Sequence, residues 1–433
     1  MIADLKLETE TEFPNLSKYW KDISYCCRCK CCIQSFNPEG KGKEGTGTGR
    51  GVYSVCPLFN VTGFDALSGF GRMSVGKSLL EGRTELTPSM VEWVYACALC
   101  GNCKYVCPSN LENPLNRDGM GDIVPGLDIT GVVEALRADC FLKGLGPLSH
   151  QKAAIKSIEY YDNPWQQPRS GRARWAKGLE IKDLSKEGVD ADILYYVGCT
   201  YAYSPGIQKI LKSTVDILKK TDCNFGILGA SEKCCGSISK RLGDFEQFEK
   251  LARENVKAIN AIGISTVITS CAGCYRTLKN EHTEIEDADY EVLHVVEYLN
   301  KLLSEGKLEF KNPVNLKVTY HDPCHLGRYG GVYDAPRKVL DAIPGLELNE
   351  MLRKKRYSFC CGGGGGLKFG FSEIALEMAK ERLSDPNIKD AGVDAVATAC
   401  PWCEINISDA VKSYGLGMEV LDIVELVARS MGD

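Results

Sequence analysis

The sequence contains no apolar run that approaches the ~18 residues needed to cross a lipid bilayer. It also lacks a secretory signal, because the first residues, MIADLKLETETEF, are acidic and polar. Both absences predict a cytoplasmic protein, in which any association with a membrane would come through a partner.

Other absences narrow the chemistry. The formal net charge is −5 and no basic stripe is present, which argues against nucleic acid as a partner. No GxGxxG fingerprint follows a predicted strand, and the glycine run at 362–366 lies inside a cysteine-bearing loop, so it is weak evidence for a nucleotide site. Flavin or nicotinamide chemistry would therefore belong to a partner.

Cysteine, by contrast, is abundant. Of the 433 residues 22 are cysteine, and 18 of these fall into four spaced sets. Disulfide frameworks of this density are typical of short secreted chains, which this long chain does not resemble. Thiolates at fixed spacings are instead typical of bound iron–sulfur clusters. The pattern therefore predicts several clusters, a reducing and oxygen-poor setting, and a role in moving electrons.

The second of the four sets reproduces the bacterial ferredoxin motif, Cys-x2-Cys-x2-Cys-x3-Cys-Pro. In that motif three thiolates on a tight loop bind one cubane, and the fourth turns toward a companion cluster. Thiolates are also the soft ligands that such clusters prefer. The set comprises Cys97, Cys100, Cys103 and Cys107, followed by Pro108.

The first set starts in the same way but is interrupted. Its fourth member, Cys56, precedes Pro57 and follows a 23-residue gap that contains the glycine-rich loop 40–51. Cys27 and Cys31 do not fit the spacing and are expected to be spare. A structural zinc site with four cysteines uses similar spacings and stays open for this set. In such paired motifs the fourth cysteine of each set binds the cluster of the other set. This crossed pattern predicts two cubane [4Fe–4S] clusters, the first held by Cys26, Cys29, Cys32 and Cys107, the second by Cys97, Cys100, Cys103 and Cys56.

The remaining two sets repeat one pattern: a single Cys, then Cys-Cys-Gly, then Cys-x2-Cys. Corresponding cysteines are 125, 126 and 129 residues apart, which indicates an internal duplication. Five thiolates exceed the four ligands of zinc or of an ordinary cubane, which leaves either one idle thiol or a larger cluster. Gly236 and Gly362 would let the backbone pass close to a bulky group. The ten cysteines are Cys199, Cys234, Cys235, Cys271 and Cys274, then Cys324, Cys360, Cys361, Cys400 and Cys403.

From about residue 190 onward, short apolar strands alternate with helices, which predicts parallel sheets with helices packed on them. Several cluster cysteines fall at predicted strand ends, where parallel sheets bind ligands. The fold class is therefore α/β: an N-terminal α-helical ferredoxin-like domain followed by two duplicated parallel-sheet Cys-Cys-Gly domains. The expected boundaries are 1–162 for the first domain, 163–190 for a linker, and 191–312 and 313–433 for the two repeats.

The spacing Cys-x34-Cys-Cys-Gly-x34-Cys-x2-Cys resembles the Cys-Cys-Gly domains of the B-type polypeptide of heterodisulfide reductase. With ferredoxin motifs in front, the chain resembles the fused D-type polypeptide of that enzyme over about residues 20–430. Sequence stretches around the cysteines, such as TSCAGCYRTL and TYHDPCHLGR, resemble that family as well. Similar architecture occurs in iron–sulfur subunits of glycolate oxidase, anaerobic glycerol-3-phosphate dehydrogenase and lactate utilisation, and in the electron-transfer subunit of class II benzoyl-CoA reductase.

The resemblance carries further expectations. In the heterodisulfide reductase branch each complete five-cysteine set holds a non-cubane [4Fe–4S] cluster, and all ten positions are present here. The implied cofactors are two cubane and two further iron–sulfur clusters. The implied partner contains flavin and would be a heterodisulfide reductase A-like protein, an electron-transfer flavoprotein or a dehydrogenase. The chain would then be a multi-cluster oxidoreductase subunit that passes electrons to or from that flavoprotein.

An alternative is catalytic: a disulfide would be reduced at a Cys-Cys-Gly cluster. His321 and His325 flank Cys324, and a protonated imidazole could donate a proton to a leaving thiolate. Equally, both rings could cap the strand end or hydrogen-bond cluster sulfur. The arginines and Trp175 of the linker are expected in a solvated stretch, and His150, His282 and His294 look incidental.

Overall fold

The computed structural model describes residues 12–36, 52–109, 126–186, 188 and 190–432. The predicted glycine-rich loop at 40–51 lies outside the described residues. None of the helices in the described part combines the length and apolar character that crossing a bilayer requires.

Contacts divide the chain into two compact units. Unit 1 comprises residues 1–152, 240–244 and 352–386, and unit 2 comprises residues 153–239, 245–351 and 387–433. The segment around Cys360 and Cys361 thus groups with the ferredoxin-like part of the chain. The domain boundaries expected above follow the sequence repeat rather than these contacts and stay a prediction.

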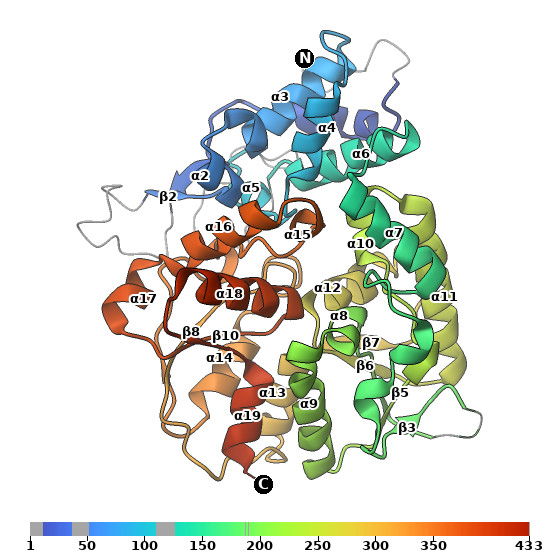
Figure 1. The fold of residues 1–433 in the computed structure, drawn as a ribbon, viewed down its shortest axis with the longest axis vertical. Helices are drawn as coiled ribbons and strands as arrows, with labels where there is room; N and C mark the ends of the chain where they lie inside the picture. Colours follow the sequence, from blue (N-terminus) through green and yellow to red (C-terminus); the bar gives the residue numbers. More distant parts are fainter. Residues whose placement is uncertain (1–11, 37–51, 110–125, 187, 189, 433) are drawn as a thin grey trace. The chain divides into compact units, whose positions relative to one another are not determined.

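Unit 1 is built around helix α6, whose residues from Ile129 to Cys140 are all buried. Helices α3, α4 and α5 pack against it (Figure 1). A short antiparallel pair, β1 (Gln34–Phe36) and β2 (Val52–Ser54), completes the unit. Its helices are η1 (Leu16–Tyr19), α1 (Trp20–Tyr25), α2 (Pro57–Thr62), η2 (Asp65–Leu67), α3 (Gly69–Leu80), α4 (Pro88–Tyr95), α5 (Asn102–Tyr105), α6 (Ile129–Leu142), η8 (Lys355–Tyr357), α15 (Leu367–Gly370) and α16 (Ser372–Leu383); α7 (Ser149–Tyr161), α10 (Ser237–Leu242) and α17 (Pro386–Ala391) cross the unit boundaries.

Helix α3 contains the letters GRMSVGKS, which match the consensus of a phosphate-binding loop, a match that sequence reasoning missed. A phosphate-binding loop follows a strand and precedes a helix, whereas these residues are helical throughout. A Cβ on Gly71 would come within 2.2 Å of the carbonyl oxygen of Asp65, so close packing explains that glycine. The segment is therefore a packed helix, not a nucleotide site.

Unit 2 contains two parallel sheets. The first has the order β3-β5-β4-β6-β7 and the second the order β11-β10-β8-β9, with every pairing parallel. The predicted strands are confirmed: β4 (Ile193–Tyr195), β5 (Phe225–Ile227), β6 (Thr266–Thr269), β7 (Glu291–His294), β8 (Lys317–Tyr320), β9 (Glu347–Leu348), β10 (Ala395–Thr398) and β11 (Glu419–Asp422). Strand β3 (Lys182–Asp183) is an addition to the predicted strands and lies within the segment 163–190 expected to be a linker. The parallel α/β fold class predicted for this part is thereby confirmed.

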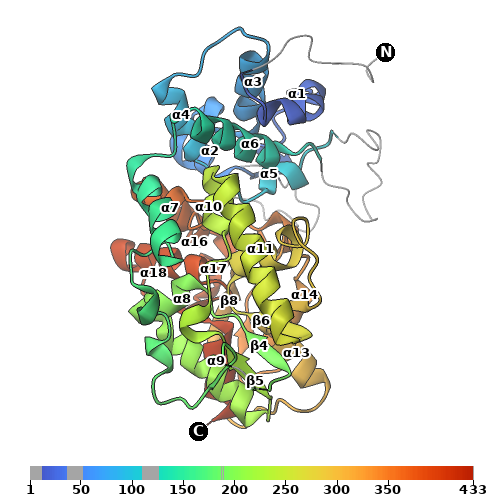
Figure 2. The same ribbon diagram turned by 90° about the vertical axis from the view of Figure 1, so that its right-hand side faces the viewer.

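Helices cover the sheets and join the two repeats. Helix α9 packs against α19, and α13 against α14, so each sheet shares its helix layer with the other (Figure 1). Figure 2 shows α11 as the long helix beside the strands of the first sheet. The principal helices are α8 (Cys199–Tyr203), α9 (Gln208–Lys220), α11 (Phe245–Ile262), α12 (Ala272–Arg276), α13 (Val295–Ser304), α14 (Asp334–Asp341), α18 (Pro401–Tyr414) and α19 (Ile423–Met431), with short turns η3 (Arg169–Gly171), η4 (Arg174–Ala176), η5 (Pro205–Ile207), η6 (Gly229–Ser231) and η7 (Thr277–Glu281).

The two Cys-Cys-Gly glycines have a common conformation. Gly236 has φ +82° and Gly362 has φ +85°, in the left-handed region that side chains rarely adopt. A Cβ on Gly236 would meet the Phe248 ring at 3.0 Å, and one on Gly362 would meet Met378 at 2.9 Å. Backbone conformation and helix packing therefore already require glycine at both positions.

Candidate metal centres

Four cysteines of unit 1 line one cavity of about 30 Å³: Cys56, Cys97, Cys100 and Cys103. Cys56 lies at the start of α2, and the other three lie on the loop between α4 and α5 or at the start of α5. The Asn102 amide donates to the carbonyl of Val55 at 3.0 Å, which fastens the ferredoxin loop to the residue before Cys56. The arrangement brings together the four residues that the crossed pattern predicts.

The electrostatics of this cavity suit a cluster. Burial raises the pKa of Cys56 to about 12 and raises that of Cys103 well above its usual value, with Cys97 and Cys100 adding to both effects. Buried thiols become thiolates only when a cation offsets the charge, and the irons of a cluster supply that charge. The residues present therefore fit an iron–sulfur cluster.

The other ferredoxin-type set also contains a buried thiol. Burial raises the pKa of Cys32 to about 12, and the neighbouring thiols Cys56, Cys26 and Cys107 act in the same direction. Burial likewise raises the pKa of Cys29 to about 12, and the neighbours that influence it are Cys31 and Cys27. The assignment of Cys26, Cys29, Cys32 and Cys107 to one cluster stays a prediction.

The two sets meet at Gly69. A Cβ on Gly69 would lie 3.0 Å from the Cβ atoms of both Cys32 and Cys103. The first residue of α3 therefore lies between one cysteine of each predicted cubane, and no side chain fits between them.

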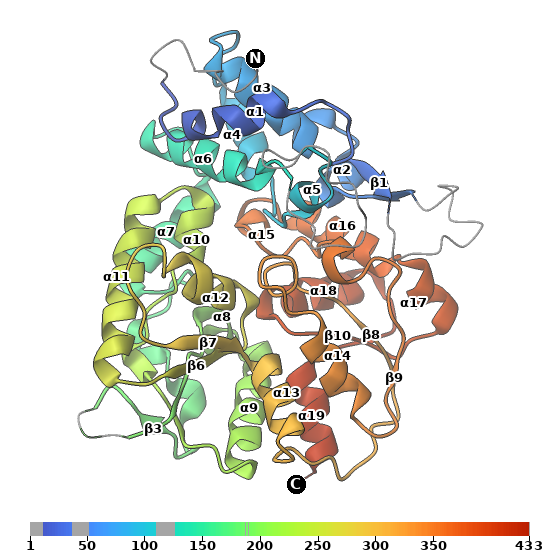
Figure 3. The same cartoon turned by 180° about the vertical axis from the view of Figure 1, so that it is seen from behind.

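All five cysteines of the first repeat are buried and lie together in unit 2. Figure 3 shows α8, which begins at Cys199, and α12, which carries Cys274, close to each other at the strands of the first sheet. The five thiols form a chain of hydrogen-bonded pairs: Cys199 with Cys234, Cys234 with Cys235, Cys235 with Cys274, and Cys274 with Cys271.

This chain has an uneven charge distribution. Hydrogen bonds from Cys234 and Cys274 hold the pKa of Cys235 well below its usual value. The hydrogen bond with Cys234 and burial raise the pKa of Cys199, and hydrogen bonds with Cys235 and Cys271 raise that of Cys274. Five thiols linked in a chain of neighbouring pairs, only one of which favours the thiolate, again require bound cations if all five are to ionise.

The first repeat also touches the second. Cys271 is hydrogen-bonded to Cys400, the cysteine that begins the Cys-x2-Cys of the second repeat. Both lie in unit 2, and each follows the last residue of its preceding strand, β6 or β10, after one intervening residue. This contact places one cysteine of the first repeat beside one cysteine of the second.

The second repeat is divided between the units. Cys324, Cys400 and Cys403 belong to unit 2, whereas Cys360 and Cys361 belong to unit 1. The amide of Gly362 donates to Cys360 Sγ at 3.4 Å and that of Gly363 donates to Cys361 Sγ at 3.5 Å, so the glycine loop supplies N–H donors to both sulfurs. The union of these five cysteines in one site stays a prediction from the sequence repeat.

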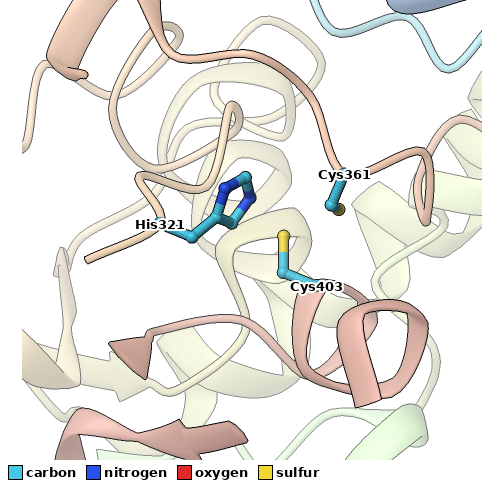
Figure 4. Close-up of side chains that lie close together, drawn as sticks. All are labelled: His321, Cys361 and Cys403. Atoms are coloured by element: carbon cyan, nitrogen blue, oxygen red, sulfur yellow. The ribbon is translucent and has the colours of Figure 1, made fainter. Parts of the chain in front are cut away.

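His321 is fully buried directly after strand β8. A ring nitrogen lies within 4.8 Å of the sulfur of Cys403, which points from helix α18 toward the ring (Figure 4). His325 lies elsewhere: its Nε2 is 3.4 Å from an Arg276 nitrogen, and its ring packs edge-on against Tyr329. Of the two candidate histidines, the structure places His321 beside a predicted ligand.

The expectation that the arginines and Trp175 of the predicted linker are solvated is wrong for Arg172 and Trp175, which are buried. The Arg172 guanidinium donates to Cys199 Sγ at 3.0 Å and pairs with Glu232 at 2.6 Å. Sequence reasoning missed it because a polar, proline-punctuated stretch gives no sign that one arginine folds inward. His282 was likewise missed: its Nε2 lies 2.8 Å from the carbonyl oxygen of Cys235.

Comparisons with known proteins match the parts of the chain that carry these cysteines. A family model described as a 4Fe-4S dicluster domain matches residues 22–111, and one described as a cysteine-rich domain matches residues 193–279 and 318–408. The D-type polypeptide of the dihydromethanophenazine:CoB–CoM heterodisulfide reductase of Methanosarcina mazei is 37% identical over 82% of this chain and 83% of that protein. Its counterpart in Methanosarcina barkeri is 35% identical over the same shares.

A third relative extends the comparison to another oxidoreductase. The EtfAB:quinone oxidoreductase of Syntrophomonas wolfei is 32% identical over 78% of this chain and 47% of that protein. The relatives are oxidoreductases or their subunits, and the family models describe iron–sulfur and cysteine-rich domains. The chain belongs to the family of D-type heterodisulfide reductase polypeptides, which are iron–sulfur oxidoreductase subunits.

Proposed function

We propose that this chain is the electron-transfer subunit of a complex and exchanges electrons with a flavoprotein partner. Two cubane clusters would be held by Cys26, Cys29, Cys32 and Cys107, and by Cys56, Cys97, Cys100 and Cys103. Two further clusters, of the non-cubane type, would be held by Cys199, Cys234, Cys235, Cys271 and Cys274, and by Cys324, Cys360, Cys361, Cys400 and Cys403. Bound there, the clusters would store and pass on single electrons.

The observation that carries this proposal is a contact inside unit 1. The glycine loop that follows Cys361 lies against the ferredoxin loop: a Cβ on Gly365 would come within 2.5 Å of the backbone of Ala98. Ala98 follows Cys97, a predicted ligand of the second cubane. A cysteine loop of the second repeat is therefore packed onto the loop that carries the ligands of the predicted second cubane, as a relay would require.

One buried side chain holds the two loops together. Arg137, on α6, donates to the carbonyl oxygens of Cys97 at 2.8 Å and of Gly365 at 2.8 Å. It also donates to the carbonyls of Tyr95 and Arg241. A fully buried arginine whose N–H groups are all directed at carbonyls fixes loop geometry instead of binding a ligand. Cys271 and Cys400 then bring the second repeat into contact with the first.

The test uses the full chain, purified without oxygen. Iron and sulfide analysis should give about sixteen irons per chain, four for each cluster. After mixing with a reduced electron-transfer flavoprotein, rapid freezing and low-temperature paramagnetic resonance should show cluster signals that appear as the flavin is reoxidised. Folded protein without iron, or loaded protein that accepts no electrons from any flavoprotein or from viologen, would end the proposal.

A second candidate function is disulfide reduction, and the position of His321 favours it. Cleavage of a disulfide to two thiols consumes two electrons and two protons. A ring nitrogen of His321, within 4.8 Å of Cys403 Sγ, is placed to hold one of these protons beside a predicted ligand.

This candidate is tested by the oxidation of reduced viologen with a series of small disulfides. Turnover that falls at least tenfold in His321→Gln but not in His150→Gln, a change at an exposed histidine of α7, would favour catalysis. Absence of turnover with every disulfide, together with intact electron exchange with a flavoprotein, would leave the relay function alone.

A further inference from the structure

Arg172 and Glu232 form a buried ion pair beside the first Cys-Cys-Gly set. Their side chains are 3% and 1% exposed, and the Arg172 Nη1 lies 2.6 Å from Glu232 Oε1. The second terminal nitrogen of Arg172 donates to Cys199 Sγ at 3.0 Å and to the carbonyl of Asp162 at 2.8 Å. The guanidinium also lies over the ring of Tyr203.

Glu232 is anchored independently of the arginine. Its two carboxylate oxygens accept from the amides of Val197 at 2.8 Å and Gly198 at 2.9 Å, the two residues before Cys199. The Glu232 carboxylate thus holds both the backbone that follows strand β4 and the Arg172 guanidinium in place. The guanidinium in turn holds the sulfur of Cys199.

The second repeat has no equivalent of this arrangement in its sequence. The residue two positions before the Cys-Cys pair is Glu232 in the first repeat and Ser358 in the second. The residue before the first cysteine is Gly198 in one and Pro323 in the other, and proline has no amide hydrogen to offer a carboxylate. The acid at position 322 is instead engaged by Arg337, which donates to both of its oxygens.

A hydrogen bond from a cation to a thiolate ligand has a known electrical consequence. Reduction adds negative charge to a cluster, so a nearby N–H donor or positive charge stabilises the reduced state more than the oxidised one and raises the potential. Glu232 opposes part of this effect, but it pairs with Nη1 of Arg172, whereas Nη2 donates to the sulfur of Cys199.

We propose that Arg172 is a positioning residue that raises the reduction potential of the first Cys-Cys-Gly centre. This inference rests on the proposed function in one respect, namely that Cys199 is a cluster ligand.

The experiment is a redox titration of the full chain followed by paramagnetic resonance. Cys199→Ser identifies which signal belongs to the first centre, since that signal is lost. In Arg172→Gln the potential of this centre should fall, changing its oxidised-to-reduced ratio at the wild-type midpoint at least tenfold, which is about 59 mV for one electron. In Glu232→Gln it should rise, because the cation loses its counter-charge. Arg172→Lys should shift the potential less than Arg172→Gln does.

The control is Arg174→Gln, which removes an exposed arginine two residues further along and should move no potential. Opposite shifts in Arg172→Gln and Glu232→Gln, confined to the first centre, support the inference because a structural effect has no reason to change sign. Unchanged potentials in loaded variants, or shifts of the same sign, overturn it. If the Arg172→Gln variant does not incorporate its clusters, the potentials measured in Arg172→Lys and Glu232→Gln test the inference instead. Wild-type protein without iron at the Cys-Cys-Gly sets would defeat the proposed function itself.

Discussion

Gly365 lies so close to Ala98 that a Cβ on the glycine would come within 2.5 Å of the carbonyl carbon and oxygen of the alanine. Ala98 follows a cysteine of the second ferredoxin-type set, and Gly365 lies four residues after Cys361 in the second repeat. The five glycines from 362 to 366 are therefore not a flexible spacer at this point. They let two cysteine loops of unit 1 pack backbone to backbone.

Gly365→Ala tests this packing. The new methyl group would clash with Ala98 and would also occupy a residue with φ +64°, so we expect a loss of stability of about 1–3 kcal/mol and slower electron passage from the cubanes to the second repeat. Thermal unfolding and freeze-quench resonance measure the two effects. Gly82→Ala is the matched control, because Gly82 has φ +63° with nothing within 4 Å of its Cβ position. Equal effects in both variants would show that backbone strain, not the contact, matters.

The crossed assignment of the two fourth ligands is tested by Cys56→Ser and Cys107→Ser. Because Cys56 shares its cavity with Cys97, Cys100 and Cys103, its loss should remove the second cubane and leave the first. Cys107→Ser should do the reverse. Each variant should lose about four irons and one resonance signal. Cys223→Ser, outside all four sets, should lose none, and loss of the same signal in Cys56→Ser and Cys107→Ser would refute the crossing.

Gly198→Ala should disable the first Cys-Cys-Gly centre. Gly198 has φ +79°, and a Cβ there would lie 3.1 Å from Cys274 Sγ, inside the group of five thiols. We expect the variant to lose the iron and resonance signal of that centre while both cubanes stay intact. Gly263→Ala provides a control with φ +75° and open space at the Cβ position. Full iron content in Gly198→Ala would mean that the site tolerates a methyl group.

Asp422 should make stability depend on pH. Burial raises its pKa to about 7, with the charge of Glu425 acting in the same direction against hydrogen bonds from Val424 and Tyr201. A carboxyl whose folded pKa lies above the unfolded value of about 3.9 contributes stability that is complete below pH ~4 and is lost as the pH rises through 7. The unfolding temperature should therefore fall between pH 5 and pH 8.

Asp422→Asn should flatten this profile, because asparagine still caps helix α19 but carries no charge. The measurement is thermal unfolding at several pH values in that range. Asp341→Asn, an exposed change on α14, should keep the wild-type slope. An unaltered slope in Asp422→Asn would assign the pH dependence to other groups.

The sequence by itself determined which residue types carry the chemistry and in what order. Cysteine spacing predicted the ferredoxin-type sets, and the duplication predicted two parallel sheets, because periodic strand–helix patterns and thiol spacings are local properties. The strands before Cys199, Cys271 and Cys400 lie where the pattern placed them. The stretch GRMSVGKS shows that a local sequence motif can mislead, because its residues lie inside helix α3 and do not form a phosphate-binding loop.

Only the tertiary structure decided which distant residues meet. Arg172 turns inward to Cys199, Gly365 packs on Ala98, and Cys271 touches Cys400. Each of these contacts joins segments that are far apart in the chain, and their formation depends on the packing of whole sheets and helices. Periodicity along the chain contains no information about such pairings, because the burial of one arginine or the approach of one glycine is stabilised by many residues that are not its neighbours in sequence.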